Sequence, residues 1–348
     1  MGFSRMLKKL LLFTAPFIIL FAIFFCFEPY DYFALSKKPQ YQTEPLSAMR
    51  LVMMKKPGRV ILGDSRMANL DVDYIHELSG IEYAKLAWGG AQIGESIDMF
   101  WFAAEHCDLE QVIFGINFYT SKGTQTGSEN RYDAIGRSMP YAKNIFKFAT
   151  NIHYWLKTLA DIKHLLTNPV YNAMGKQDKI EIPEDPARLS IIPDPEMGEK
   201  WRLNMEVYAD TIQEGMVEYD FQPQTYAALQ EVIDYCDDND IDLIFVLPPV
   251  HEVIYERVIE VNGMQDDLRE IKEFLIQRAT VYDFEVRTWF TSDPDTFYDG
   301  FHLMLENKHL FARLLFTDTS ECPEIVRRYI KNGTAVIDEH IKTAFEIR

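Results

Sequence analysis

The sequence is poor in cysteine and in basic residues. Its four cysteines, Cys26, Cys107, Cys236 and Cys322, are widely spaced without a C-x-x-C pair, so neither a zinc site nor a thioredoxin-type redox site is indicated. Acidic residues number 53 against 35 basic ones, a formal charge of −18. This balance argues against a nucleic-acid-binding protein, which needs a basic face. Apolar residues make up 47% of the chain, enough for a large core and too many for a disordered one.

Long apolar runs are also scarce, and the one present covers residues 10–27 without a charge. As a helix it reaches about 27 Å, enough to cross a hydrocarbon core. Arg5, Lys8 and Lys9 precede it, so the positive-inside rule predicts a cytoplasmic N-terminus and an extracytoplasmic remainder, at the cell surface or in the periplasm. The alternative is a cleaved signal peptide, with a shorter apolar core and small residues at the cut. The bulky residues that follow Phe27 favour an anchor.

The chain beyond the anchor divides into a linker and one large domain. We expect a cytoplasmic stub and transmembrane anchor over 1–27, a juxtamembrane linker over 28–57, and a catalytic domain over 58–348. Three cysteines fall in this exported part, so they allow at most one disulfide, whose identity the sequence does not give.

Short apolar runs and helical patterns alternate along the domain. The runs, typical of strands, are 59–62, 82–88, 111–114, 242–247 and 280–284, and the helical patterns are 71–79, 94–106, 223–238, 252–278 and 305–317. This alternation predicts an α/β fold of three α/β/α layers around a mostly parallel sheet. A large insert, about 119–222, separates the third and fourth runs and is helical around 141–170; a lid, a substrate groove and a partner surface are its alternatives.

Ligands bind beyond the carboxyl ends of parallel strands, and three of the predicted ends carry residues of chemical use. In Gly63-Asp64-Ser65, the hydroxyl and amide of the serine can both face the sheet edge. Gly90 follows the second run, where glycine lets an amide approach an oxyanion. Asn117 follows the third and can donate its side-chain amide. Taken singly, each also fits an ordinary helix cap, turn or loop contact.

A late Asp-x-x-His sequence supplies an acid and a base. The carboxylate of Asp299 can accept a hydrogen bond from Nδ1–H of His302, three residues later. Nε2 is then available to take a proton from a serine. A lone Asp-x-x-His is a frequent accident in a chain with eight histidines. Four such segments in this order, each at an expected loop, point to one site.

These segments together resemble the SGNH (GDSL-like) hydrolase superfamily. The family's Gly-Asp-Ser matches at Ser65, its second-block glycine at Gly90, its Gly-x-Asn at Asn117, and its Asp-x-x-His at His302. The resemblance covers about 58–118 and 240–316 and leaves the insert outside.

The resemblance implies an acyl-enzyme route. Ser65 would attack an ester or thioester carbonyl, His302 would act as general base and then acid, and Asp299 would orient His302. The amides of Ser65 and Gly90 and the side chain of Asn117 would form the oxyanion hole. No organic cofactor or metal is implied; a metalloenzyme built on Asp299 and His302 lacks a third ligand at a recognisable spacing.

The chain also departs from the family pattern. Arg66 stands where leucine is usual, Phe118 stands where aspartate often follows the asparagine, and the second-block asparagine is absent. Arg66 is a candidate to bind a substrate phosphate or carboxylate, or to pair with a surface acid. His251, after Pro248-Pro249-Val250 at another strand end, is a candidate to line the pocket.

An exported domain of this type on one anchor resembles, in architecture, membrane-tethered proteins that modify cell-envelope polymers, such as the D-alanyl transfer protein of teichoic acid synthesis. We therefore expect O-acyl transfer, or ester hydrolysis, on an envelope polysaccharide or lipid-linked polymer. The expected partners are an acyl donor, a glycan or polymer acceptor and a multi-spanning membrane O-acyltransferase, with no nucleic acid. The alternative from another class is a non-catalytic binding or assembly protein that recruits a partner through the insert.

Overall fold

A computed structural model of the chain describes residues 3–28, 30–33, 45–116, 118, 134–173, 205–207, 209–210, 212–214, 223–297, 299–317 and 325–331. The chain divides into two compact units. One consists of Met1–Tyr41 and Gly136–Leu189, and the other of Gln42–Ile135 and Ser190–Arg348. We describe each unit by itself and call the second one the sheet unit.

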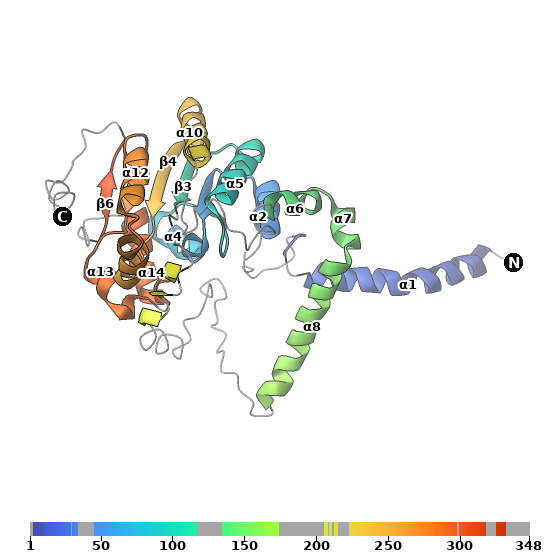
Figure 1. The fold of residues 1–348 in the computed structure, drawn as a ribbon. Helices are drawn as coiled ribbons and strands as arrows, with labels where there is room; N and C mark the ends of the chain where they lie inside the picture. The colour runs from blue at the N-terminus through green and yellow to red at the C-terminus, as the bar shows by residue number, and fades with distance from the viewer. Residues whose placement is uncertain are drawn as a thin grey trace. The chain divides into compact units, whose positions relative to one another are not determined.

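The sheet unit is built on a mixed sheet (Figure 1). Its strands are β1 (Arg59–Gly63), β2 (Ala84–Ala87), β3 (Gln111–Gly115), β4 (Asp242–Leu247), β5 (Thr280–Asp283) and β6 (Arg327–Tyr329). They lie in the order β2-β1-β3-β4-β5-β6, and all neighbours are parallel except β6, which runs antiparallel to β5. This confirms an α/β fold with a mostly parallel sheet.

Helices connect the strands of this unit. They are α2 (Pro45–Lys55), α3 (Ser65–Ala68), α4 (Val72–Ser79), α5 (Ile93–His106), α10 (Pro223–Asp238), α11 (Glu252–Tyr255), the π-helix η3 (Glu256–Val261), α12 (Gln265–Ile276), α13 (Trp289–Ser292), the 3-10 helix η4 (Pro294–Thr296) and α14 (Leu305–Phe316). Aspartates begin two of them: Asp64 caps α3, and Asp71 caps α4 by accepting two backbone N–H bonds. Such caps satisfy amides that lack partners within the helix.

Alternate residues of the strands pack into the core. Ile61 and Ile113 form a buried cluster with Ile75 of α4 and Phe311 of α14. Phe114, which follows Ile113 on β3, is also fully buried. Its ring contacts that of Phe245 on β4, with centroids 5.7 Å apart. Burial of alternating residues on both sides is typical of parallel strands and explains their continuous apolar sequences.

The strand order fixes where a site can form. The chain runs from β1 to β2 in one direction and then places β3 on the other side of β1. Ligands bind at the carboxyl ends of strands where the order reverses in this way. The expected site therefore lies at the ends of β1 and β3, which are Gly63 and Gly115.

The other unit is helical. It contains α1 (Phe3–Phe27), α7 (Ile145–Thr150), α8 (Ile152–Ala173) and most of α6 (Ala134–Ala142). Residues Lys8–Phe27 of α1 are long and apolar enough to cross a membrane, with a mean hydropathy of 2.7 and 6% of the residues buried. Their length and composition fit a membrane anchor or a signal sequence.

Several expected boundaries differ in the structure. Residues 45–55 of the expected linker form α2, whose Leu46, Met49 and Val52 are buried in the sheet unit. The expected helix 252–278 is broken after η3, where Gly263 adopts a φ of +69°. The sequence reading missed β6, whose three residues are too few to show alternation. Of the expected insert, 119–133, 174–204, 208, 211 and 215–222 lie outside the described residues.

Candidate active site

Three residues from distant parts of the sequence form a chain of hydrogen bonds. Oγ of Ser65 lies 2.6 Å from Nε2 of His302. Nδ1 of the same ring lies 2.7 Å from Oδ2 of Asp299. The carboxylate favours the tautomer with a proton on Nδ1, which leaves Nε2 to accept the serine proton. This is the order of contacts that nucleophilic catalysis by serine requires.

The loop that carries His302 is held from two sides. The second carboxylate oxygen of Asp299 accepts the backbone N–H groups of Phe301 at 3.1 Å and His302 at 2.9 Å. Gly300 turns the chain with a φ of +83°, a conformation that favours glycine. Its carbonyl accepts the backbone N–H of His251 at 2.8 Å, which joins the loop to the segment after β4. Asp299 therefore orients the imidazole and also shapes its loop.

Ser65 is the first residue of α3 and lies directly after β1. Oδ1 of Asp64 accepts the N–H of Arg66 at 3.0 Å, and this cap begins the helix at the serine. Ser65 is half-buried, and the side chain of His302 is 16% exposed. The hydroxyl is thus positioned at the sheet edge, within reach of solvent.

Two glycines make room for the residue that seats α3. Met67 is fully buried. A β-carbon at Gly63 would lie 2.7 Å from Cγ of Met67, and one at Gly115 would overlap the same atom. Gly63 also has a φ of +137°, which side chains rarely adopt. The glycines of the first and third motif segments thus both leave room for Met67, two residues beyond Ser65.

The expected oxyanion donors are only partly placed. Gly90 follows β2 in a turn with a φ of +71°, half-buried. The next helix is fixed close by, because the N–H of Gln92 donates to the carboxylate of Glu95 at 3.0 Å. The amide of Ser65 lies at the start of α3, where helix N–H groups lack internal acceptors. Asn117 lies outside the described residues.

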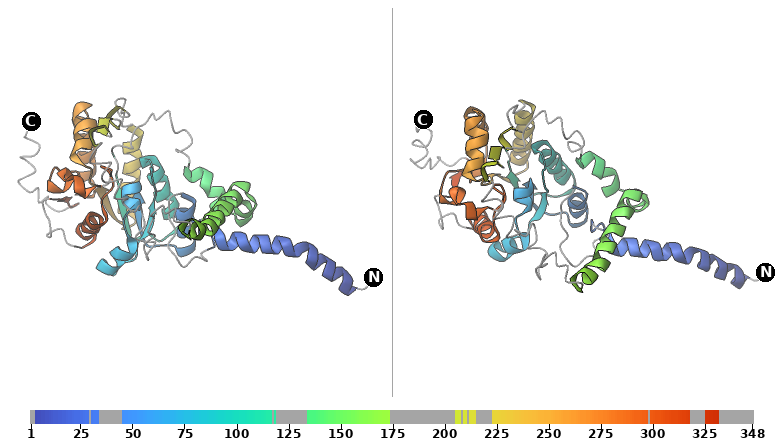
Figure 2. Two further views of the ribbon diagram at one scale, coloured as in Figure 1. Left: turned by 90° about the horizontal axis from the view of Figure 1, so that it is seen from below. Right: turned by 60° about the horizontal axis from the view of Figure 1, so that its bottom comes forward.

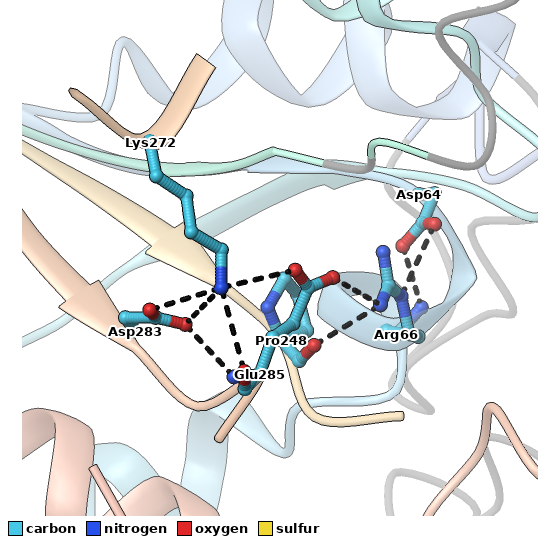
Figure 3. A network of polar contacts seen from close by, with 6 residues as sticks. All are labelled: Asp64, Arg66, Pro248, Lys272, Asp283 and Glu285. Atoms are coloured by element: carbon cyan, nitrogen blue, oxygen red, sulfur yellow. Dashed lines mark hydrogen bonds and ion pairs between the residues drawn. The ribbon is translucent and has the colours of Figure 1, made fainter. Parts of the chain in front are cut away.

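Arg66 is turned into the protein and joins a buried polar network (Figure 3). Its guanidinium contacts Oδ2 of Asp64 at 3.4 Å and donates to the carbonyl of Pro248 at 3.1 Å. The Glu285 carboxylate lies 4.0 Å away. Beyond it, Nζ of Lys272 contacts Glu285 at 3.6 Å and Asp283 at 3.0 Å. This placement argues against the expectation that Arg66 binds substrate or a surface acid, because its partners are all buried.

The network carries three acids and two bases. Burial raises the pKa of Glu285, and Lys272 and Arg66 only partly offset that effect. Burial lowers the pKa of Lys272, but Asp283 and Glu285 outweigh it and the net direction is upward. The network holds one acid more than it holds bases, and burial is the main cause of the raised pKa of Glu285.

A small cavity lies beside His302 and the network. It is lined by the side chains Arg66, Asn69, Pro248, Pro249, Phe301, His302, Leu303, Lys308 and Phe311. Its volume is about 10 Å³, enough for one water molecule. Arg66 and Lys308 both border this small cavity.

His251 is buried, with 1% of its surface exposed, and acts as a helix cap. Its Nδ1 accepts the N–H of Val253 at 3.2 Å and begins α11. Burial lowers the pKa of His251, in keeping with a neutral imidazole that accepts a bond. The structure therefore places this residue beneath the Asp299–His302 loop. We had expected His251 to line the pocket; its side chain instead caps a helix.

The chemistry of the site rests on these side chains. Within the described ranges, no group of three metal-ligating side chains is close enough to hold a metal ion. Sequence reasoning missed Met67, whose apolar side chain gave no signal, and Glu285 with Lys272, which belong to none of the motif segments. Residues 281–286 are buried without a break, so the predicted strand that ends at 284 could have indicated a buried acid.

Comparison with known proteins does not assign the chain to a family. No protein-family model matches the chain, and a search of curated proteins finds no similar sequence.

Proposed function

We propose that this protein is an SGNH-type serine acyl-ester enzyme. The observation that carries the proposal is the pair of hydrogen bonds that link Asp299 to His302 and His302 to Ser65. The nucleophile and the base are 237 residues apart in the sequence, so a chance contact of this geometry between them is improbable. Nothing comparable in the described chain competes with this site.

The proposal includes the finer fold, three α/β/α layers of SGNH type. Three features support it: the strand order, the reversal point between β1 and β3, and the position of each motif segment after a strand or in the loop before α14. These features belong to many α/β enzymes, so the reaction is argued from the site itself.

In the first half-reaction, Ser65 Oγ bonds to the acyl carbon and its proton passes to Nε2 of His302. The carbonyl oxygen takes the negative charge and meets the amides of Ser65 and Gly90, with Asn117 as a third donor. Each such donor contributes on the order of 3 kcal/mol to the transition state. Nε2 then gives its proton to the departing alcohol or thiol, which leaves an acyl-Ser65 ester. An acceptor hydroxyl reverses these steps and carries the acyl group away.

The acceptor decides the outcome. A sugar hydroxyl of an envelope polysaccharide or lipid-linked polymer gives an O-acyltransferase, and water gives an esterase. The location is part of the proposal: α1 anchors the protein with its N-terminus in the cytoplasm, and the sheet unit lies outside. The length and hydropathy of α1 support this, as do the basic residues before it. A multi-spanning membrane O-acyltransferase is the proposed supplier of acyl groups.

A single-turnover measurement tests the proposal. The full chain in detergent micelles is mixed with p-nitrophenyl acetate, with and without a cell-wall oligosaccharide, and acyl-enzyme is followed by intact mass. We expect one acetyl adduct, located on Ser65 and absent from Ser65→Ala. Transfer to the sugar that outpaces hydrolysis establishes a transferase, and hydrolysis unaffected by the sugar establishes an esterase.

A scaffold protein predicts a different result. It would show no adduct with the acetate ester or with a fluorophosphonate probe, in wild type or in Ser65→Ala, while remaining folded by circular dichroism. That outcome would reject the catalytic proposal.

A further inference from the structure

The helical unit carries an apolar stripe that the acyl chemistry does not use. Along α8, Ile152, Leu156, Leu159 and Leu166 recur at spacings of four, three and seven residues, so they share one face of the helix. Their exposed fractions are 71%, 59%, 50% and 69%. In α7, Phe146 is 79% exposed. An exposed apolar row of this length marks an interaction surface.

The same segment differs in charge from the rest of the protein. Residues 134–173 contain five basic residues and one acidic residue, a formal charge of +4 in a chain of −18. Four of the basic side chains are exposed: Arg137, Lys143, Lys147 and Lys163. Lys163 falls within the apolar stripe, where its stem can cover apolar surface while its ammonium group reaches outward. Basic residues around an apolar face are typical of helices in the interface of anionic bilayers.

Aromatic contacts join α8 to the end of the apolar helix α1. The Trp155 ring stacks on Phe24 with centroids 4.4 Å apart and meets Phe21 edge-on at 5.7 Å. Just after α1, the hydroxyl of Tyr30 accepts a hydrogen bond from Nζ of Lys157 at 3.1 Å. Tryptophan and tyrosine gather at the boundary between hydrocarbon and water. The first turns of α8 are thereby fixed at the level where α1 would leave a bilayer.

The direction of α8 fits such a position. In Figures 1 and 2, α8 runs across the direction of α1 and not alongside it. Trp155 and Leu156 are neighbours, so the apolar stripe begins beside the contact with α1. If α1 crosses the bilayer, α8 then extends along the membrane surface with its stripe within reach of the acyl chains.

We propose that α7 and α8 form an interfacial membrane-binding element that lies on an anionic phospholipid bilayer beside the exit of α1. The element holds the protein to the membrane in addition to the single anchor and sets the orientation of the helical unit. Its ligand is a lipid surface, recognised by the apolar stripe and by the exposed basic side chains. The proposal does not depend on the acyl chemistry.

Other binding partners would fit the apolar stripe and its basic surroundings less well than a lipid surface does. Two copies of this chain that met through their stripes would bring two segments of charge +4 together, which opposes pairing. A membrane protein or the acidic remainder of the same chain could cover the apolar residues, but neither accounts for aromatic rings at the end of α1. The experiment separates these occupants from lipid.

The test places the photo-crosslinking residue p-benzoylphenylalanine at Leu159 or Leu166 in the full chain. The matched control carries it at Ala160, which is also exposed but lies about 100° around the helix from Leu159. Each protein is reconstituted into vesicles of phosphatidylcholine, alone or with phosphatidylglycerol, and irradiated. We expect lipid adducts by intact mass at Leu159 and Leu166, several-fold more abundant than at Ala160.

A charge control completes the design. The pair Lys147→Gln and Lys163→Gln should lower the lipid-adduct yield in vesicles that contain phosphatidylglycerol and leave it unchanged in pure phosphatidylcholine. Equal lipid yields at Leu159 and Ala160 would overturn the proposal. So would products dominated by crosslinks within the chain, between two copies or, in native membranes, to another protein. Since none of these readouts involves Ser65, failure here is distinguishable from failure of the proposed activity.

Discussion

Met67 occupies the space that a side chain at Gly115 would need. The methionine belongs to the helix that begins at Ser65, and the glycine ends the neighbouring strand. Cores are packed closely enough that one added methyl group is felt. The position of Ser65 therefore depends on the absence of a side chain on another strand.

Replacing Gly115 with alanine should displace Met67 and, with it, α3. Overpacking of this kind costs about 1–3 kcal/mol of unfolding free energy. A nucleophile displaced by an ångström typically loses about 100-fold in rate. We expect the rate of Ser65 acetylation to fall to this degree while substrate binding changes little, measured by single-turnover mass spectrometry and urea unfolding.

Two variants control that experiment. Gly94→Ala adds the same methyl group at an exposed helix position with no atom within 4 Å of the new carbon, so it should leave the rate unchanged. Met67→Ala removes the atoms that collide, so Gly115→Ala should cost less in that background than in the wild type. Additive costs in this double-mutant cycle would show that the two residues do not interact as the structure has them.

Asp299→Asn should abolish catalysis with little loss of structure. An asparagine oxygen can still accept the N–H groups of Phe301 and His302, so the loop keeps its shape. Its NH₂ group, facing Nδ1, stabilises the wrong imidazole tautomer, and the expected loss of acetylation rate is on the order of 10⁴-fold.

Asp299→Ala is the matched comparison, because it also loses both backbone bonds. It should be less stable than Asp299→Asn and similarly inactive. Near-normal acetylation by the asparagine variant would remove Asp299 from the mechanism.

The sequence predicts much of the sheet unit for simple physical reasons. Strands buried on both faces require continuous apolar runs, and residues such as Ile61 and Phe114 provide them. The partners Ser65, Asp299 and His302 were also predictable, because each lies in a short segment with a recognisable residue pattern. The membrane-length helix follows from composition alone.

Other features could not be read from the sequence. The depth of Arg66 depends on the Pro248 carbonyl and on Glu285, which are brought near only by the folded sheet. From the sequence, the arginine after Ser65 is expected to be exposed, because most arginines are. Likewise α2 resembled a linker, since only its packing in the sheet unit shows which of its faces is buried.

The buried network predicts strong coupling between Arg66 and Glu285. Arg66→Met alone removes the cation of Asp64 and one of the two cations that contact Glu285, and removing one partner of a buried pair costs about 3–5 kcal/mol. Adding Glu285→Gln removes one of those charges, so the double variant should recover part of the stability. Urea unfolding of the four proteins measures the coupling.

The surface pair of Arg269 and Asp266 gives the control for that cycle. Both side chains are largely exposed, so Arg269→Met should change the unfolding free energy by less than about 0.5 kcal/mol. If Arg66→Met were equally mild, the network would not contribute to stability as its burial implies.

Glu285 should also give the protein a characteristic pH dependence. Burial raises the pKa of this carboxyl above its ordinary value of 4.5. Its contribution to stability is therefore complete below pH 4.5 and is lost as the pH rises through the folded-state pKa. The unfolding free energy of the wild type should consequently decline with rising pH relative to that of Glu285→Gln, which cannot ionise. Other groups with shifted pKa values, such as Glu28 at about 7 and Lys85 at about 8, are present in both proteins and do not disturb this comparison. The raised pKa of Lys272 acts only above pH 10.5, and the lowered pKa of His251 is common to both proteins. Parallel stability curves between pH 5 and 9 would mean that Glu285 is ionised in the fold and that the network carries a net negative charge.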